Sequence, residues 1–222
     1  MVGFRSFSAQ DRDELIADPR AFMASIGCEV GSSCYNQSIA GQPDLLTFAF
    51  DETGTPSYRL DTRNGTDAVM VRLPFFQLRK AQGNEVSFSA YLVTYAVGAT
   101  PQTVLGTAAR LAFTANMNGC TFGIGNQANA NGALTVTHSN SAGHDSTDAN
   151  SQAQRLQARA LVGQGGTLLE PGTYRTDAKQ AVTFGYRSPG QLWRFAYLSY
   201  RRSEGRIITL GVMDVGVQRL MV

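Results

Sequence analysis

Cys120 and His138 are the two residues of this sequence whose chemistry and spacing suggest a reactive site. The chain has three cysteines and two histidines in all. Cys120 directly follows Asn118-Gly119, which indicates a tight turn, because glycine adopts backbone angles that other residues avoid. A thiol becomes a good nucleophile at neutral pH when a base takes its proton, and histidine is the usual base. The pair therefore predicts nucleophilic catalysis by a cysteine.

A β-hairpin would bring the two residues together. Residues 120–124 and 133–138 have the pattern of strands, and the Gly/Asn-rich stretch between them is typical of a turn. In an antiparallel pair the start of the first strand lies opposite the end of the second, so we expect Cys120 and His138 to be neighbours. The turn at Asn118 and Gly119 would also expose successive backbone N–H groups, which an oxyanion hole requires.

These residues resemble the catalytic core of the cytotoxic necrotizing factor-like glutamine deamidases. That group includes the Burkholderia lethal factor and, more distantly, the bacterial chemoreceptor deamidases. Its pattern is a strand with a threonine, a small residue-Gly-Cys turn, a short strand, a loop and a strand-borne histidine. Thr114, Gly119-Cys120 and His138 match it, and Asn118 stands where a serine is common. The resemblance covers residues 68–165 and does not extend to the rest of the chain.

The resemblance implies a bacterial toxin or virulence effector, a hydrolase that converts a glutamine of a host protein to glutamate. Cys120, with its pKa lowered by His138, would attack the carboxamide carbon, and Thr114 would accept a hydrogen bond from the imidazole. No cofactor and no metal are implied. The partner would be a host protein with a reactive glutamine, reached in the host cytosol after secretion by a route other than Sec.

Other interpretations stay open. The same dyad would serve a cysteine protease, an amidase or a transglutaminase. A non-enzymatic β-rich binding module is a further alternative, since cysteine is among the most buried residue types. His144, the second histidine, lies in a polar loop and is expected at the surface. We expect Asp145 and Asp148 to take part in helix capping.

Composition narrows the class of protein. The 222 residues fit one domain, spanning 1–222, in which residues 1–40 could form an N-terminal helical appendage. A net charge of +2 argues against nucleic-acid binding, and no apolar stretch reaches the roughly 20 residues of a membrane span. We expect a soluble monomer without a Sec signal peptide. The odd number of cysteines does not indicate a disulfide framework, although Cys28 and Cys34 could pair.

Strand patterns dominate the chain from residue 45 onward. Helices are expected at 8–27, divided at Pro19, and at 146–163, with a loop at 28–44. The expected strands are 45–50, 68–76, 85–97, 103–115, 120–124, 133–138, 181–186, 191–200 and 206–212, with 217–222, which lies outside the residues described below, as a further candidate. The predicted fold class is α+β: a β-rich domain of two packed mixed or antiparallel sheets, sandwich-like, with peripheral helices.

Overall fold

The computed structural model describes residues 6–35, 45–61, 69–93, 95–127, 129, 131–140, 148–174 and 180–215. The helices in these ranges are α1 (Ala9–Ala17), α2 (Pro19–Ser25), α3 (Ser32–Tyr35), α4 (Asp148–Val162) and α5 (Pro171–Tyr174). The strands are β1 (Gly27–Val30), β2 (Leu45–Glu52), β3 (Ser57–Asp61), β4 (Val69–Leu73), β5 (Phe75–Lys80), β6 (Phe88–Val93), β7 (Gln102–Leu105), β8 (Leu111–Thr114), β9 (Thr121–Ile124), β10 (Leu134–Ser139), β11 (Thr167–Leu169), β12 (Gln180–Tyr186), β13 (Arg194–Ser203) and β14 (Arg206–Asp214).

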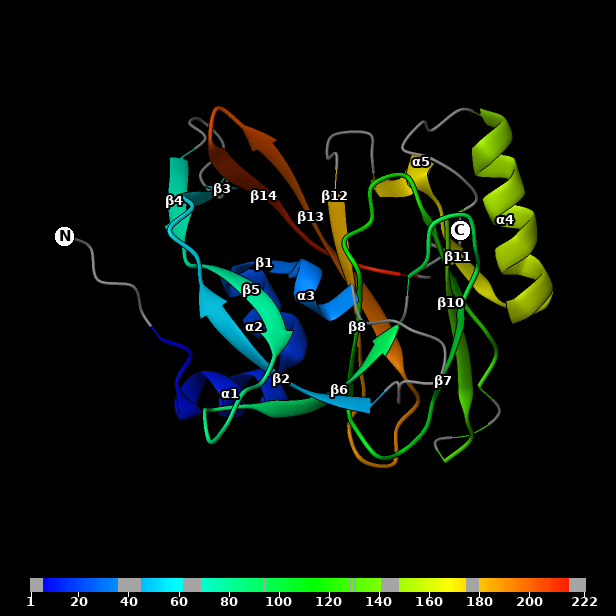
Figure 1. Ribbon diagram of the computed structural model, residues 1–222, viewed down its shortest axis with the longest axis horizontal. Helices are drawn as coiled ribbons and strands as arrows, with labels where there is room; N and C mark the ends of the chain where they lie inside the picture. Colours follow the sequence, from blue (N-terminus) through cyan, green and yellow to red (C-terminus); the bar gives the residue numbers. More distant parts are fainter. Residues whose placement is uncertain are drawn as a thin grey trace, which may run out of the picture.

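Two sheets account for all of these strands (Figure 1). The large sheet has ten strands in the order β1-β5-β2-β6-β8-β12-β13-β14-β3-β4, and the small sheet has four in the order β11-β9-β10-β7. Three pairs of the large sheet are parallel, namely β1 with β5, β6 with β8, and β14 with β3. Between β6 and β8 the chain leaves the large sheet to form β7 of the small one, so the two sheets are interleaved in sequence.

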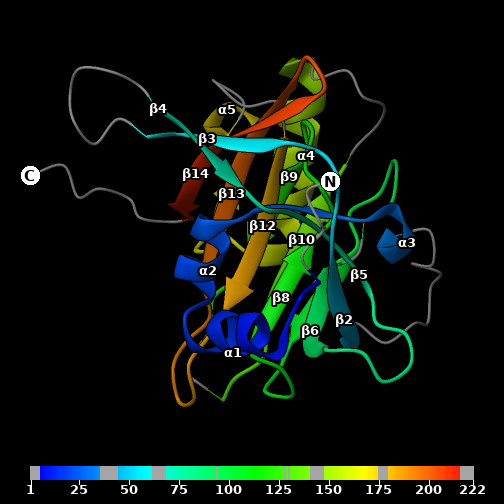
Figure 2. The ribbon, with the colours of Figure 1, turned by 90° about the vertical axis from the view of Figure 1, so that its left-hand side faces the viewer.

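The predicted α+β sandwich of two packed sheets is wrong. Of the described residues, 47% are in strands and 21% in helices, and the ten-stranded sheet curls into a nearly closed, barrel-like form (Figure 2). Period-2 alternation locates strands but does not specify their partners. Ten twisted strands in one sheet tend to curl, and this curling, rather than a facing second sheet, organises the larger part of the molecule.

Strands in the middle of the large sheet are buried on both faces. One face contributes to a first hydrophobic cluster with α1 and α2, and the other to a second cluster shared with the small sheet. On β8, Phe113 belongs to the first cluster and Ala112 to the second. Because side chains alternate along a strand, Thr114 shares the face of Ala112, which is the face toward the small sheet.

The first two helices form as the sequence predicts. Ser8 is the N-cap of α1: its hydroxyl accepts from the backbone N–H of Asp11, whose carboxylate accepts from the backbone N–H of Ser8 at 2.8 Å. Pro19 begins α2, where its missing N–H costs nothing, and so divides the helical segment in two. Phe22 and Met23 of α2 are buried in the first cluster, which docks this helix against the large sheet.

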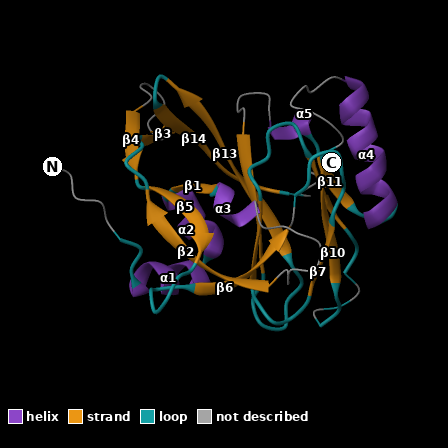
Figure 3. Ribbon diagram, in the orientation of Figure 1, coloured by secondary structure: helices purple, strands orange, loops and turns teal. Residues whose placement is uncertain are grey.

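The helix α4 covers the outer face of the small sheet (Figure 3). The close approach depends on Gly123 of β9, where a Cβ atom would lie 2.8 Å from Thr137 and 3.0 Å from Val162 of the helix. Ser139 and Thr100 bond to each other at 2.8 Å, and Thr100 donates to Gln157 of α4 at 2.7 Å. The opposite face of the small sheet therefore turns toward the large one.

Three segments differ from their predicted structure. Residues 68–76, predicted as one strand, divide at Pro74 into β4 and the first part of β5, which stand near opposite ends of the strand order of the large sheet. Residues 103–115, predicted as one strand, divide into β7 and β8 in different sheets, with Gly106 and the bend after it between them. The predicted loop at 28–44 contains β1 and α3 in its described part, and β1 pairs in parallel with β5. Short elements such as these lack the length that makes periodicity readable. Within the described ranges, no helix has the length and apolar character that crossing a membrane demands.

Candidate active site

A turn holds Cys120 directly before β9, an inner strand of the small sheet. Met117 forms an isolated β-bridge with Ala181 through two backbone hydrogen bonds of 2.7 and 3.0 Å, and the chain bends directly after it. Gly119 then adopts a φ of +96°, a conformation that side-chain-bearing residues rarely reach. Asn118 is exposed and Cys120 is 5% exposed. The glycine ahead of the cysteine is therefore required by backbone geometry, as the sequence predicts.

Tyr174, at the end of α5, fastens this turn from the other side. Its hydroxyl accepts from the backbone N–H of Gly119 at 3.0 Å and donates to the carbonyl oxygen of Cys120 at 2.8 Å. The tyrosine is buried, so water competes little for these two bonds. The N–H of Gly119, one of the expected oxyanion donors, is therefore engaged by Tyr174 in this structure.

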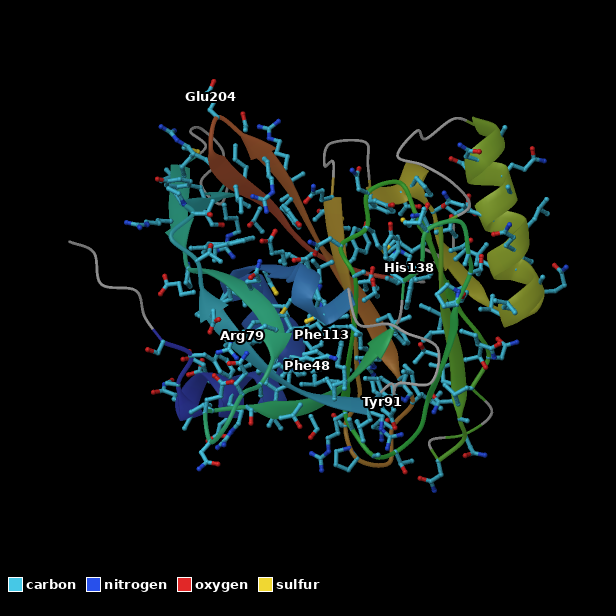
Figure 4. The ribbon with its side chains drawn as sticks, in the orientation of Figure 1. Phe48, Arg79, Tyr91, Phe113, His138 and Glu204 are labelled. Carbon is cyan, nitrogen blue, oxygen red and sulfur yellow. The ribbon has the colours of Figure 1, made fainter. Side chains whose placement is uncertain are left out.

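The predicted hairpin between β9 and β10 is present. In its register His138 lies opposite Phe122 and Ser139 opposite Thr121, so the end of β10 reaches the level of the Cys120 turn. Along β10, alternate residues Val136 and His138 face the second hydrophobic cluster, whereas Ser139 faces α4. His138 is fully buried between the sheets (Figure 4).

Thr114 and His138 meet across the gap between the two sheets. The Oγ1 atom of Thr114 lies 3.4 Å from Nδ1 of His138, and the same hydroxyl donates to the carbonyl oxygen of Ala115 at 2.6 Å. A hydroxyl has a single proton, so toward His138 it acts as the acceptor and Nδ1 carries the hydrogen. Nε2 of His138 is then the lone-pair nitrogen, and it is buried with no hydrogen bond among the described residues.

Burial lowers the pKa of His138 from its ordinary 6.5 to about 4. The cause is desolvation, which penalises the charged imidazolium in an apolar site. His138 is consequently neutral at pH 7 and does not present a positive charge to the Cys120 thiol at rest. A neutral imidazole with an available Nε2 lone pair is nevertheless the form that accepts a proton from an attacking nucleophile.

The sequence did not point to Tyr95 and Asn140, which belong to the same site. The Tyr95 ring lies against the His138 imidazole, with centroids 5.2 Å apart, and its hydroxyl accepts from Nδ2 of Asn140 at 2.9 Å. Burial raises the pKa of Tyr95, and the negative charge of an ionised Cys120 raises it further. Asn140 directly follows β10 and lies two residues after His138, a spacing that puts two side chains on the same face of a strand. This spacing is the signal that could have identified it.

Two surface hollows lie away from this site. One, of about 330 Å³, is bordered by α1, Arg110 and Tyr186, and the other, of about 490 Å³, by Phe7, Asp51 and Glu85. Neither is lined by a residue of the turn, so neither marks the Cys120 site. In the described ranges no three metal-ligating side chains come together.

The other sequence predictions have mixed outcomes. Cys28 and Cys34 do not pair: all three cysteines of the chain are described, and each is a buried thiol outside any disulfide. His144 and Asp145 lie outside the described residues, and Asp148 is the first residue of α4.

No protein-family model matches the chain, and no curated protein sequence matches it either.

Proposed function

We propose that this chain is a cysteine-dependent deamidase that converts a glutamine of a protein substrate to glutamate. The observation that carries the proposal is the state of His138, whose Nδ1 is bound to Thr114 while Nε2, buried and neutral, has no hydrogen-bond partner in the described chain. A buried polar atom left in that condition calls for an explanation, and a catalytic base is one. The resemblance to glutamine deamidases supplies the substrate class, and a toxin or effector acting on a host protein is part of the proposal.

The reaction uses three groups of the chain. Sγ of Cys120 forms a bond to the carboxamide carbon while Nε2 of His138 takes the thiol proton. The C–N bond then breaks, and ammonia leaves with the proton returned by His138. In the second half, His138 takes a proton from water, whose oxygen adds to the thioester carbon. The C–S bond then breaks, His138 returns the proton to Sγ, and the glutamate side chain is released. Thr114 keeps the imidazole in the tautomer that both halves need.

The deciding experiment is a mass-spectrometric search of a treated host-cell lysate for glutamine-to-glutamate conversions, comparing the native protein with Cys120→Ser. We expect conversions at one or a few glutamines with the native protein alone. Cleavage at the same sites would instead identify a protease, and addition of a primary amine a transglutaminase. If lysates treated with an excess of the native protein and of Cys120→Ser show the same glutamine-to-glutamate conversions, the proposal is contradicted.

Thr114→Val tests the role of the threonine. Valine keeps the volume of the side chain but removes the acceptor for Nδ1 of His138. A hydrogen bond of this kind contributes about 1 kcal/mol, so we expect the deamidation rate to fall roughly fivefold to tenfold. Thr114→Ser, which keeps the hydroxyl, is the matched variant and should retain most of the rate. Equal losses in both variants would show that shape, not the hydrogen bond, matters here.

One observation favours a second candidate, a binding module without catalysis. Cys120 is 5% exposed and His138 is fully buried, as packing residues are. Alkylation by iodoacetamide at neutral pH separates the two functions. A catalytic Cys120 is alkylated in the native protein while Cys28 and Cys34 stay protected, whereas a packing Cys120 is protected as they are until urea unfolds the chain.

A further inference from the structure

Tyr95 covers the imidazole that the proposed reaction depends on. It follows β6, whose residues Tyr91 and Val93 contribute to the second hydrophobic cluster on the face toward the small sheet. Tyr95 itself is half-buried, while His138 beneath it is fully buried. With ring centroids 5.2 Å apart and an interplanar angle of 53°, the phenol ring is in contact with the imidazole over part of its surface.

Asn140 fixes the far end of the tyrosine. Its Nδ2 donates to the Tyr95 hydroxyl at 2.9 Å, and its backbone N–H donates to the carbonyl oxygen of Ala99 at 3.1 Å. Ala99 belongs to the same connection between β6 and β7 as Tyr95. Asn140, directly after β10, thus holds both the backbone of this connection and the ring that it carries, so that Tyr95 is clamped over His138.

We propose that Tyr95 is a positioning residue of this site, which shields the His138 imidazole from water and holds its orientation, with Asn140 as its anchor. Thr114 fixes one edge of the imidazole through Nδ1, and the phenol ring packs against its face. Two different kinds of contact, from β8 and from the connection after β6, then determine where Nε2 points.

The Tyr95 ring is part of the burial that lowers the pKa of His138. Water that reaches the imidazole stabilises the imidazolium, so removing the tyrosine ring raises the pKa of His138 from about 4 toward its ordinary 6.5. Among the described residues no charged group adds to the lowered pKa of His138, whose cause is burial, and the titratable groups that interact beside it are the Tyr95 phenol and the Cys120 thiol. Thr114, from β8, and Phe122, opposite on β9, contribute no charge.

The test is an NMR titration of the imidazole resonances, which needs no substrate. Only two histidines have to be assigned, and His144→Gln removes one of them. We expect the His138 midpoint near 4 in the native protein and in Tyr95→Phe, which keeps the ring, and a midpoint moved toward 6.5 in Tyr95→Ala. Asn140→Ala, which releases the hydroxyl, should give a smaller rise.

Tyr186→Ala is the matched control. Tyr186 is also half-buried and its pKa is also raised mainly by burial, but it lies at the opposite end of β12 from Ala181, the partner of Met117. An unchanged His138 midpoint in both Tyr95→Ala and Asn140→Ala overturns the proposal, as does an equal rise in Tyr186→Ala. If Tyr95→Ala does not fold, Tyr95→Leu and Asn140→Ala decide by the same criterion.

The catalytic consequence alone depends on the proposed function. If the protein is a deamidase, Tyr95→Ala should lower kcat more than it changes KM, and Tyr95→Phe should restore most of kcat. If the native protein has no deamidase activity but the His138 midpoint rises in Tyr95→Ala, the proposed function is refuted and the role of Tyr95 stands. If the native protein is a deamidase but the midpoint does not move in Tyr95→Ala, the function stands and the role of Tyr95 is refuted.

Discussion

Cys120→Ser is expected to lose deamidation almost completely, by at least about 10⁴-fold, because removal of a nucleophile disables the catalytic groups that act with it. A serine hydroxyl holds its proton far more tightly than a thiol, and the neutral His138 gives no positive charge to offset the difference. The fold should survive, since the exchange replaces one sulfur atom by oxygen with little change in volume. Intact-mass analysis of substrate glutamines measures the activity, and circular dichroism and thermal unfolding verify the fold.

Cys34→Ala is the matched control for this variant. Cys34 is also buried, but it belongs to the first hydrophobic cluster, where its S–H donates to the carbonyl oxygen of Leu78 at 3.4 Å. It lies on the other face of the large sheet from Thr114, so its replacement should leave deamidation at the native rate. Activity that survives in Cys120→Ser, or disappears equally in Cys34→Ala, would refute a nucleophilic Cys120.

The local structure around the candidate nucleophile could be predicted from the sequence. Asn118-Gly119 indicated the turn, and the positive φ of Gly119 is the physical reason that a glycine stands there. The two flanking strand patterns predicted the β9–β10 hairpin, whose register brings His138 to the level of that turn. Both predictions concern residues close together in the chain, for which turn chemistry and alternation are sufficient.

The large-scale arrangement could not be predicted in the same way. The parallel pairing of β6 with β8 joins strands separated by an excursion into the other sheet, and alternation carries no signal for such a partner. Tyr95 and Tyr174 were missed for the same reason. Tyr95 lies just after β6 and Tyr174 at the end of α5, both far in sequence from the turn, and alternation does not indicate that either ring reaches the site.

The acid stability of the protein should depend on His138, and His138→Gln should remove that dependence. In the unfolded chain this imidazole titrates near 6.5, whereas in the folded protein its pKa is about 4. Between these two pH values the unfolded state binds a proton that the folded state excludes, so the free energy of unfolding falls as the pH falls. The contribution of neutral His138 to the free energy of unfolding is fully present above pH 6.5 and is lost by pH 4. Its size is about 3 kcal/mol.

Urea unfolding at a series of pH values, for the native protein and for His138→Gln, measures this difference directly. Glutamine is uncharged throughout the range, so the free energy of unfolding of the variant should change much less than that of the native protein between pH 6.5 and 4. Glu85, whose pKa is lowered from 4.5 to about 2, mainly by Arg79, overlaps with this window only at its lower end and does so equally in the native protein and in the variant. His138→Gln should also lose deamidation by roughly 10²- to 10⁴-fold, the usual contribution of a general base. Parallel pH profiles of native and variant stability would show that His138 is solvated in the folded protein, and a solvated imidazole would remove the reason for assigning the unpartnered Nε2 as the base.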